Sequence, residues 1–183
     1  MRVLYCGLSG VVHPSATTYQ LVRGKNPWNN GHAEYEAVPW LGQTLACWPD
    51  LKIVLTSTLP WKHGLPAILQ RMPPLAGRVI GFTFKDLTTE PVRLVRTRSG
   101  TSRLSSFSSE DYWRMNKGDI VAAHVEWLKP EAWVAVDDED ILWRPEHAAH
   151  VCIVDGCEGL MHPTEQDRLL TCLEMNFGPG SRR

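Results

Sequence analysis

The residues best suited to chemistry follow a short apolar run. Trp133 to Val136 predicts a strand buried on both faces, and it leads directly into Asp137, Asp138, Glu139 and Asp140. Carboxylates crowded at a strand end repel one another, so they require a cation or hydrogen-bond donors. Two interpretations follow from this: a solvated acidic turn, or the acidic edge of a ligand or Mg²⁺ site at the carboxyl end of a parallel sheet.

Other polar residues lie where predicted elements end or begin. Leu51–Leu55 predicts a strand that ends on the hydroxyl side chains of Thr56 and Ser57. Lys117 begins a predicted helix and supplies a positive charge. Considered singly, a strand-end hydroxyl and a first-turn lysine are usually solvated surface groups. Only a shared location gives them a role in binding.

The first predicted strand, Arg2 to Leu8, ends at Ser9 and Gly10. Backbone amides from Leu8 to Val11 could form an anion-binding nest there. Side chains alternate along a strand, so Cys6 points away from the side that Gly7 and Ser9 share. Cys6 is therefore expected to be a small buried hydrophobic residue.

The succession of elements predicts an α/β fold. A Rossmann-like, doubly wound parallel sheet of about five strands is expected, with helices on both faces, the first strand central, and a small cap or none. One domain spans residues 1–176, and the tail 177–183 is expected to be disordered. The predicted strands are Arg2–Leu8, Leu51–Leu55, Arg78–Phe82, the acidic strand and His150–Val154, and the predicted helices are Tyr35–Trp48, Leu65–Met72, Lys117–Leu128 and Thr164–Met175.

Residues 84–115 interrupt this rhythm and are expected to form an irregular insert, rich in Ser, Thr and Arg. It is either a mobile polar loop or small cap, or a surface that binds nucleic-acid phosphates. The basic residues concerned are Arg93, Arg96, Arg98 and Arg103. A second cluster has a spacing that fits no standard zinc pattern: His147, His150, Cys152, Cys157 and His162.

Composition limits the classes of function. The 183 residues carry a formal net charge of −1, so no overall field draws the chain to nucleic acid or to an acidic membrane. No apolar run approaches the length of a membrane span, and no signal peptide is expected. The five cysteines form no CxxC pair, which favours reduced thiols and a cytoplasmic location.

Four segments together resemble the motifs of haloacid-dehalogenase-like (HAD) phosphatases. VLYCGLSGVVHP resembles the first motif, KIVLTST the second, the helix begun by Lys117 the third, and WVAVDDED the fourth. Order and spacing agree from about Val3 to Leu160. The subgroup that the segments resemble most is the HAD domain associated with Swiss-Army-knife RNA-repair proteins.

The resemblance implies a set of site residues and one departure from the family pattern. The first motif of the family carries a nucleophilic aspartate and an acid/base aspartate two residues later, and Gly7 and Ser9 stand at those positions. The implied catalytic positions are Ser9, Thr56 and Lys117, and the implied ligand-binding residues are Gly7, Ser9, Gly10, Thr56, Ser57 and Lys117. Asp137 and Asp138, with the Ser9 carbonyl, would hold Mg²⁺ weakly.

Three functions follow as hypotheses. The first is a HAD-like domain that has lost phosphatase activity and keeps a phosphate or Mg²⁺-type pocket for a phosphorylated small molecule or a protein partner. The second is an active HAD-type phosphohydrolase that acts on nucleic-acid or nucleotide phosphates. The third is a nucleic-acid-associated module that binds through the arginine-rich insert. Gly7 favours the first over the second.

Overall fold

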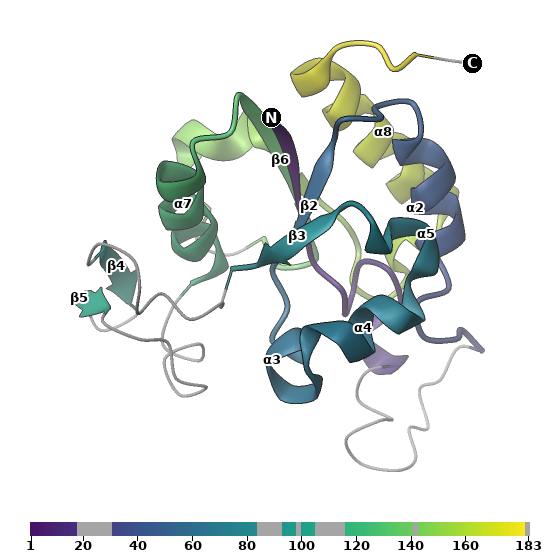
Figure 1. Ribbon diagram of the computed structural model, residues 1–183, viewed down its shortest axis with the longest axis horizontal. Coiled ribbons are helices and arrows are strands. Elements are labelled where there is room, and N and C mark those ends of the chain that lie inside the picture. The colour runs from purple at the N-terminus through teal and green to yellow at the C-terminus, as the bar shows by residue number, and fades with distance from the viewer. Residues whose placement is uncertain (18–30, 84–92, 98–99, 105–115, 141–142, 182–183) are drawn as a thin grey trace.

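The computed structural model describes residues 1–17, 31–83, 93–97, 100–104, 116–140 and 143–181 (Figure 1). Its centre is a sheet of five parallel strands in the order β3-β2-β1-β6-β7. These strands are β1 (Arg2–Cys6), β2 (Lys52–Leu55), β3 (Val79–Phe82), β6 (Ala132–Asp137) and β7 (Val151–Ile153). The predicted fold class is confirmed, including the central position of the first strand between the second strand and the acidic one.

Helices cover both faces of the sheet. In Figure 1, α7 lies on one side, and α2, α5 and α8 lie on the other. The helices are α2 (Val38–Leu45), α3 (Leu59–His63), α4 (Leu65–Arg71), α5 (Pro73–Ala76), α7 (Lys117–Leu128) and α8 (Pro163–Phe177), with 3-10 turns η1 (Pro145–His150) and η2 (Gly159–Met161). The short helices α3 and α5 were not expected from the sequence.

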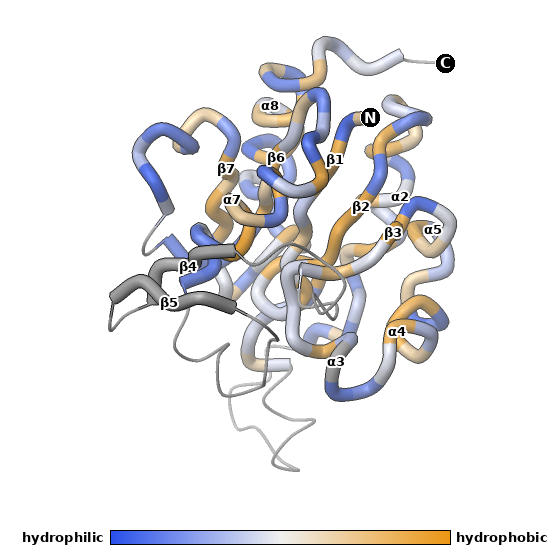
Figure 2. Tube along the Cα trace, turned by 60° about the vertical axis from the view of Figure 1, so that its left-hand side comes forward, coloured by the Kyte–Doolittle hydropathy of each residue, from blue (hydrophilic) through white to orange (hydrophobic). Residues whose placement is uncertain are grey.

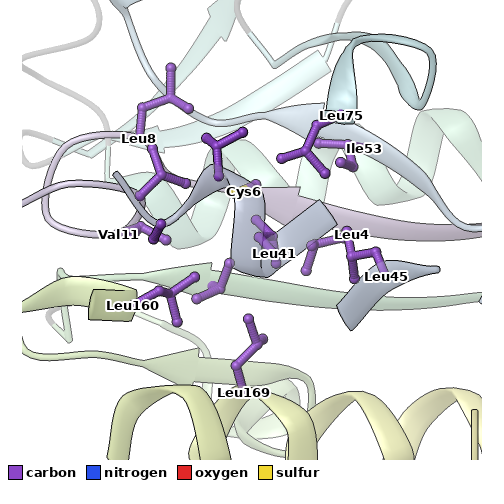
Figure 3. Close-up of a cluster of buried hydrophobic side chains, with 14 of the residues drawn as sticks. Leu4, Cys6, Leu8, Val11, Leu41, Leu45, Ile53, Leu75, Leu160 and Leu169 are labelled. Atoms are coloured by element: carbon purple, nitrogen blue, oxygen red, sulfur yellow. The ribbon is translucent and has the colours of Figure 1, made fainter. Parts of the chain in front are cut away.

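Side-chain alternation divides the core into two layers. Leu4 and Cys6 of β1 join the larger cluster with residues of α2 and α8, such as Leu41 and Leu169 (Figure 3). Val3 and Tyr5 of β1 face the opposite way, into a smaller cluster with Val121 of α7. Figure 2 shows the apolar segments following the strands through the interior. Each fully buried aliphatic side chain contributes about 1.5–3 kcal/mol, so the central strands are fixed firmly.

Helix α2 starts later than expected, and α7 buries Val121 in the core while Trp127 is partly exposed. Helix α2 begins at Val38 and not at Tyr35, because Tyr35 has a φ of 59°, a left-handed conformation that cannot continue a helix. On α7, Trp127 is 39% exposed, and Val121 takes the buried place in the smaller core cluster.

Part of the predicted irregular insert has regular structure. β4 (Arg93–Thr97) and β5 (Gly100–Leu104) pair antiparallel as a hairpin, and β4 lies beside α7. Arg98 lies outside the described residues, and so does most of the remainder of residues 84–115. The described residues 93–97 and 100–104 therefore form a hairpin within the segment that was expected to be irregular.

The expectation of a disordered tail is wrong for residues 177–181. Phe177 is the last residue of α8 and is buried. Beyond it, Trp48 Nε1 donates to the Gly178 carbonyl at 3.0 Å, and the Ser181 amide donates to the Cys47 carbonyl at 2.9 Å. These hydrogen bonds hold the tail against the end of α2.

The helices were also compared with the requirements of a membrane span. In the described part of the chain, none of them combines the length and the apolar character needed to cross a bilayer.

Candidate functional site

Strand alternation and register place three site positions in one row. Cys6 of β1 lies opposite Leu55 of β2 and Val136 of β6, so the next residues, Gly7, Thr56 and Asp137, lie side by side. Two backbone hydrogen bonds extend the ladder to this level, from the Gly7 amide to the Val136 carbonyl and from the Thr56 amide to the Cys6 carbonyl, both at 3.0 Å. All three positions face α7, whose first residue is Lys117.

The Asp137 carboxylate joins these elements. Lys117 Nζ lies 2.5 Å from Oδ1, and the Glu139 amide donates to the same oxygen at 3.1 Å. Thr56 Oγ1 donates to Oδ2 at 3.3 Å. Thr56, Lys117 and Asp137 are all buried, and we call them the Asp137 cluster. A charged pair this well enclosed is held by its mutual attraction and by the added donors.

Helix α7 is fixed at the end that carries Lys117. The Asn116 side chain caps it by accepting the Asp119 amide at 2.7 Å. Asp119 is itself buried and accepts from Arg144 Nε at 3.0 Å. Arg144 was missed at the sequence level, because it lies in a loop without a motif. Capping and ion pair together determine where the lysine points.

Burial raises the pKa of Asp137 to about 6, and Asp138 adds to the rise, while the Lys117 ammonium acts against both. The ionised form is thus favoured near neutral pH, and protonation occurs in mildly acidic solution. A proton on this carboxyl would release Lys117 from its ionic partner.

Gly7 offers no nucleophile to this row. A Cβ atom added there would lie 3.0 Å from Asp137 Oδ2 and 2.8 Å from Val11 Cγ2. The space beside Gly7 is therefore already taken by the neighbouring carboxylate. Cys6 does not substitute, because it lies in the opposite core layer and burial raises the pKa of its thiol to about 12.

The turn after β1 uses its own backbone donors. The Gly10 amide donates to the His13 carbonyl at 2.8 Å, and the Val11 amide donates to the Leu8 carbonyl at 3.2 Å. Two of the four amides of the predicted anion nest are therefore used within the turn. Ser9 forms a backbone bridge with His13 and is not among the donors to Asp137.

Asp138 lies on the other side of the sheet. Its Oδ2 accepts from Ser15 Oγ at 2.9 Å and lies 2.1 Å from the place that a Cβ on Gly10 would take. A Cβ on Gly156 would also lie close to the same oxygen, at 2.7 Å. The absence of a side chain at Gly10 lets the Asp138 carboxylate approach the backbone closely. Gly10 also has a φ of 75°, a left-handed conformation that glycine adopts readily.

The donor set does not fit the Mg²⁺ that the resemblance implies. Gly7 supplies no carboxylate, the Asp137 carboxylate is paired with Lys117, and Asp138 faces the opposite side. Among the described residues, no group of three or more His, Cys, Asp or Glu side chains could hold a metal ion. Mg²⁺ requires several oxygen ligands in near-octahedral geometry. No chemical step is therefore assigned to it.

The remaining sequence candidates lie apart from the Asp137 cluster. Ser57 Oγ accepts the Leu59 amide at 3.2 Å at the start of α3. His150 stacks on Trp133 and lies in η1, while Cys152 lies in the larger core cluster. These positions give Ser57 a local structural role and do not assemble a zinc site.

The first strand is central, Gly7, Thr56 and Asp137 lie in one row at the ends of three neighbouring strands, and Lys117 of α7 is paired with Asp137. The chain belongs to the family described as the HAD domain in Swiss Army Knife RNA repair proteins, whose model matches residues 3–164. Comparisons with curated proteins and with solved structures found no significant match.

Proposed function

We propose that this domain binds a phosphate group without hydrolysing phosphate esters. The observation that carries the proposal is Gly7, which stands where the family pattern has its nucleophile and borders the Asp137 carboxylate. Covalent phosphoryl transfer needs an attacking side chain, and its loss removes many orders of magnitude in rate. Cys6 is on the wrong face to replace it.

The Asp137 cluster supplies the groups that would receive the phosphate. Lys117 offers a cation and Thr56 a hydroxyl, and both are now directed at Asp137. An incoming anion competes with this carboxylate, so protonation of Asp137 assists binding. Since burial raises the pKa of Asp137 to about 6, binding takes up a proton and is tighter in mildly acidic solution.

The class of ligand is suggested by the family description. It places these domains in RNA repair proteins. We therefore propose a phosphorylated RNA terminus as the ligand. The basic side chains of the insert lie partly outside the described residues and are not needed for this proposal.

Hydrolysis is tested with 5′- and 3′-phosphorylated RNA oligonucleotides, with and without Mg²⁺. We expect wild-type protein to release phosphate no faster than a variant that carries Asp137→Ala and Asp138→Ala. Circular dichroism confirms that the variant is folded. Mg²⁺-dependent release that disappears in the variant would instead establish an active phosphohydrolase, and Ser9→Ala would then test the nucleophile.

Binding is tested with the same oligonucleotides, with sulfate as a probe that does not titrate between pH 5 and 7. We expect sulfate to bind more tightly at pH 5 than at pH 7, by about fivefold or more for a group that titrates near 6. Thr56→Val should weaken binding. Thr58→Val is the matched control, because Thr58 makes no side-chain cap at α3. Equal affinity for phosphorylated and unphosphorylated RNA would contradict the proposal.

A further inference from the structure

Glu139 places a second carboxylate beside the buried ammonium of Lys117. Glu139 Oε1 lies 4.0 Å from Lys117 Nζ, and the Glu139 side chain is 56% exposed while that of Lys117 is 9% exposed. An anion oxygen that accepts from this ammonium at about 2.8 Å would lie within about 7 Å of Glu139 Oε1. Any anion bound at Lys117 is therefore close to a negative charge that borders the solvent.

The backbone of Glu139 is held on both sides. Its amide donates to Asp137 Oδ1 at 3.1 Å, and its carbonyl accepts from Trp143 Nε1 at 2.7 Å. The Trp143 ring is partly buried against the smaller core cluster. The carboxylate can therefore move by side-chain rotation, but it stays in the neighbourhood of Lys117 as long as these two hydrogen bonds remain.

Nearby charges do not compensate for this carboxylate. Arg144 is already paired with Asp119, at 3.0 Å. Among the described residues, the Lys117 ammonium thus lies close to two carboxylates, those of Asp137 and Glu139. If Asp137 is protonated when an anion binds, one ammonium and one carboxylate remain. A singly charged ligand then adds one negative charge to a balanced pair, and a doubly charged ligand adds two.

We propose that Glu139 makes the Asp137 cluster selective for a singly charged phosphate over a doubly charged one. The inference rests on the proposed function, because it requires the phosphate to bind at Lys117. Repulsion from Glu139 grows with the charge of the ligand: at about 7 Å in water, it weakens binding by about threefold for each negative charge. A terminal phosphate loses its second proton near pH 6, at about the pKa of a phosphomonoester, so the selected form is the ester monoanion.

The test compares sulfate with methyl sulfate, because both keep a constant charge between pH 5 and 7 and differ by one unit. The full chain is titrated at constant low ionic strength, where screening is weak, and binding is followed by the NMR amide signals of Gly7 and Thr56. We expect Glu139→Gln to strengthen sulfate binding by about tenfold and methyl sulfate binding by about threefold. Comparing the two gains cancels any steric effect of the methyl group.

Two further variants separate local charge from other causes. Glu139→Asp keeps the charge and should keep the selectivity of wild-type protein. Glu126→Gln removes the same charge from an exposed residue nine positions after Lys117 on α7, about 14 Å along the axis, and should leave both affinities nearly unchanged. The inference would be overturned if Glu139→Asp behaved like Glu139→Gln, or if Glu126→Gln produced the same gains.

Failure of this inference and failure of the proposed function give different results. If both anions bind and Glu139→Gln strengthens them equally, the charge selectivity is refuted, and phosphate binding at Lys117 stands. If neither anion binds to wild-type protein or to Glu139→Gln, the Asp137 cluster holds no anion, and both proposals are refuted.

Discussion

Asp137 and Asp138 are neighbours in sequence, yet they belong to two regions with different physical organisation. Asp137 faces α7 and is held by charge, through Lys117. Asp138 faces the opposite layer. It is held by close packing against Gly10 and Gly156 and by a hydrogen bond from Ser15. The comparison shows that an acidic strand end can serve two purposes at once, because alternation sends successive side chains to opposite faces.

The two regions should also differ in the kinds of substitution that destabilise them. On the Asp137 side, the sensitive quantity is the balance of charge in a buried place, which depends on pH. On the Asp138 side, it is the space left by glycines, which does not depend on pH. Substitutions that change charge should therefore affect mainly the surroundings of Asp137, and substitutions that add volume should affect mainly the surroundings of Asp138.

The largest effect is expected from Lys117→Met. It leaves the buried Asp137 carboxylate without its cation and should reduce the free energy of unfolding by about 3–5 kcal/mol at pH 7. Urea unfolding measures this, with Lys62→Met on exposed α3 as the control. The double variant with Asp137→Asn should recover much of the loss. A loss no larger than in the control would show that the pair is not needed for stability.

Gly10→Ala tests the close packing around Asp138. The φ of 75° disfavours alanine, and its Cβ would overlap the Asp138 carboxylate, so a loss of about 3 kcal/mol is expected. Gly77→Ala is the matched control, because nothing lies within 4 Å of a Cβ there. Thermal unfolding at pH 5 and pH 7 should give the same loss. A loss that changes with pH would break the contrast between the two regions.

His13 adds a pH dependence of the opposite sign to that of Asp137. Burial lowers the pKa of His13 to about 4, so the folded state binds fewer protons than the unfolded state, and stability is lost as pH falls from 6.5 to 4. The raised pKa of Asp137 acts in reverse, and stability falls as pH rises from about 4 to about 6. Wild-type protein should therefore lose up to about 3 kcal/mol relative to His13→Asn across the His13 range.

Unfolding midpoints in urea at pH 4.5 and pH 7 measure this difference. Asparagine keeps an acceptor for the Tyr35 amide, which now donates to His13 Nδ1 at 3.2 Å. His63→Asn, on the exposed end of α3, is the control. If the variant keeps the pH profile of wild-type protein, another group is responsible for it.

The smallest effect is expected from Ser15→Ala. It removes one hydrogen bond to Asp138 Oδ2 and should cost about 1 kcal/mol. Because the glycine contacts remain, the loop keeps its shape. Thermal unfolding beside Ser181→Ala, whose side chain is exposed, checks the value. A loss comparable with that of Gly10→Ala would mean that this region too depends on a polar contact.

The alternation of side chains along strands and the order of strands and helices in the sequence predicted much of the fold and of the Asp137 cluster. The central place of β1, the location of Thr56 and Lys117 at strand and helix ends, and the opposite face of Cys6 all follow from periodicity. The separation of Asp137 from Asp138 follows from the same alternation but was obscured by their shared charge. Arg144 and the pairing of the insert could not be predicted, because contacts between distant loops leave no local pattern.

The central position of β1 has a consequence for how the chain is made. Among the strands that the structure describes, Arg2 to Cys6 is synthesised first, yet one of its two neighbours is β6, beginning at Ala132. At a synthesis rate of about 5–20 residues per second, β1 waits several seconds with one edge unpaired. Its apolar side chains can be enclosed on both faces only after α7 and β6 have appeared, so folding of the domain is completed late in translation.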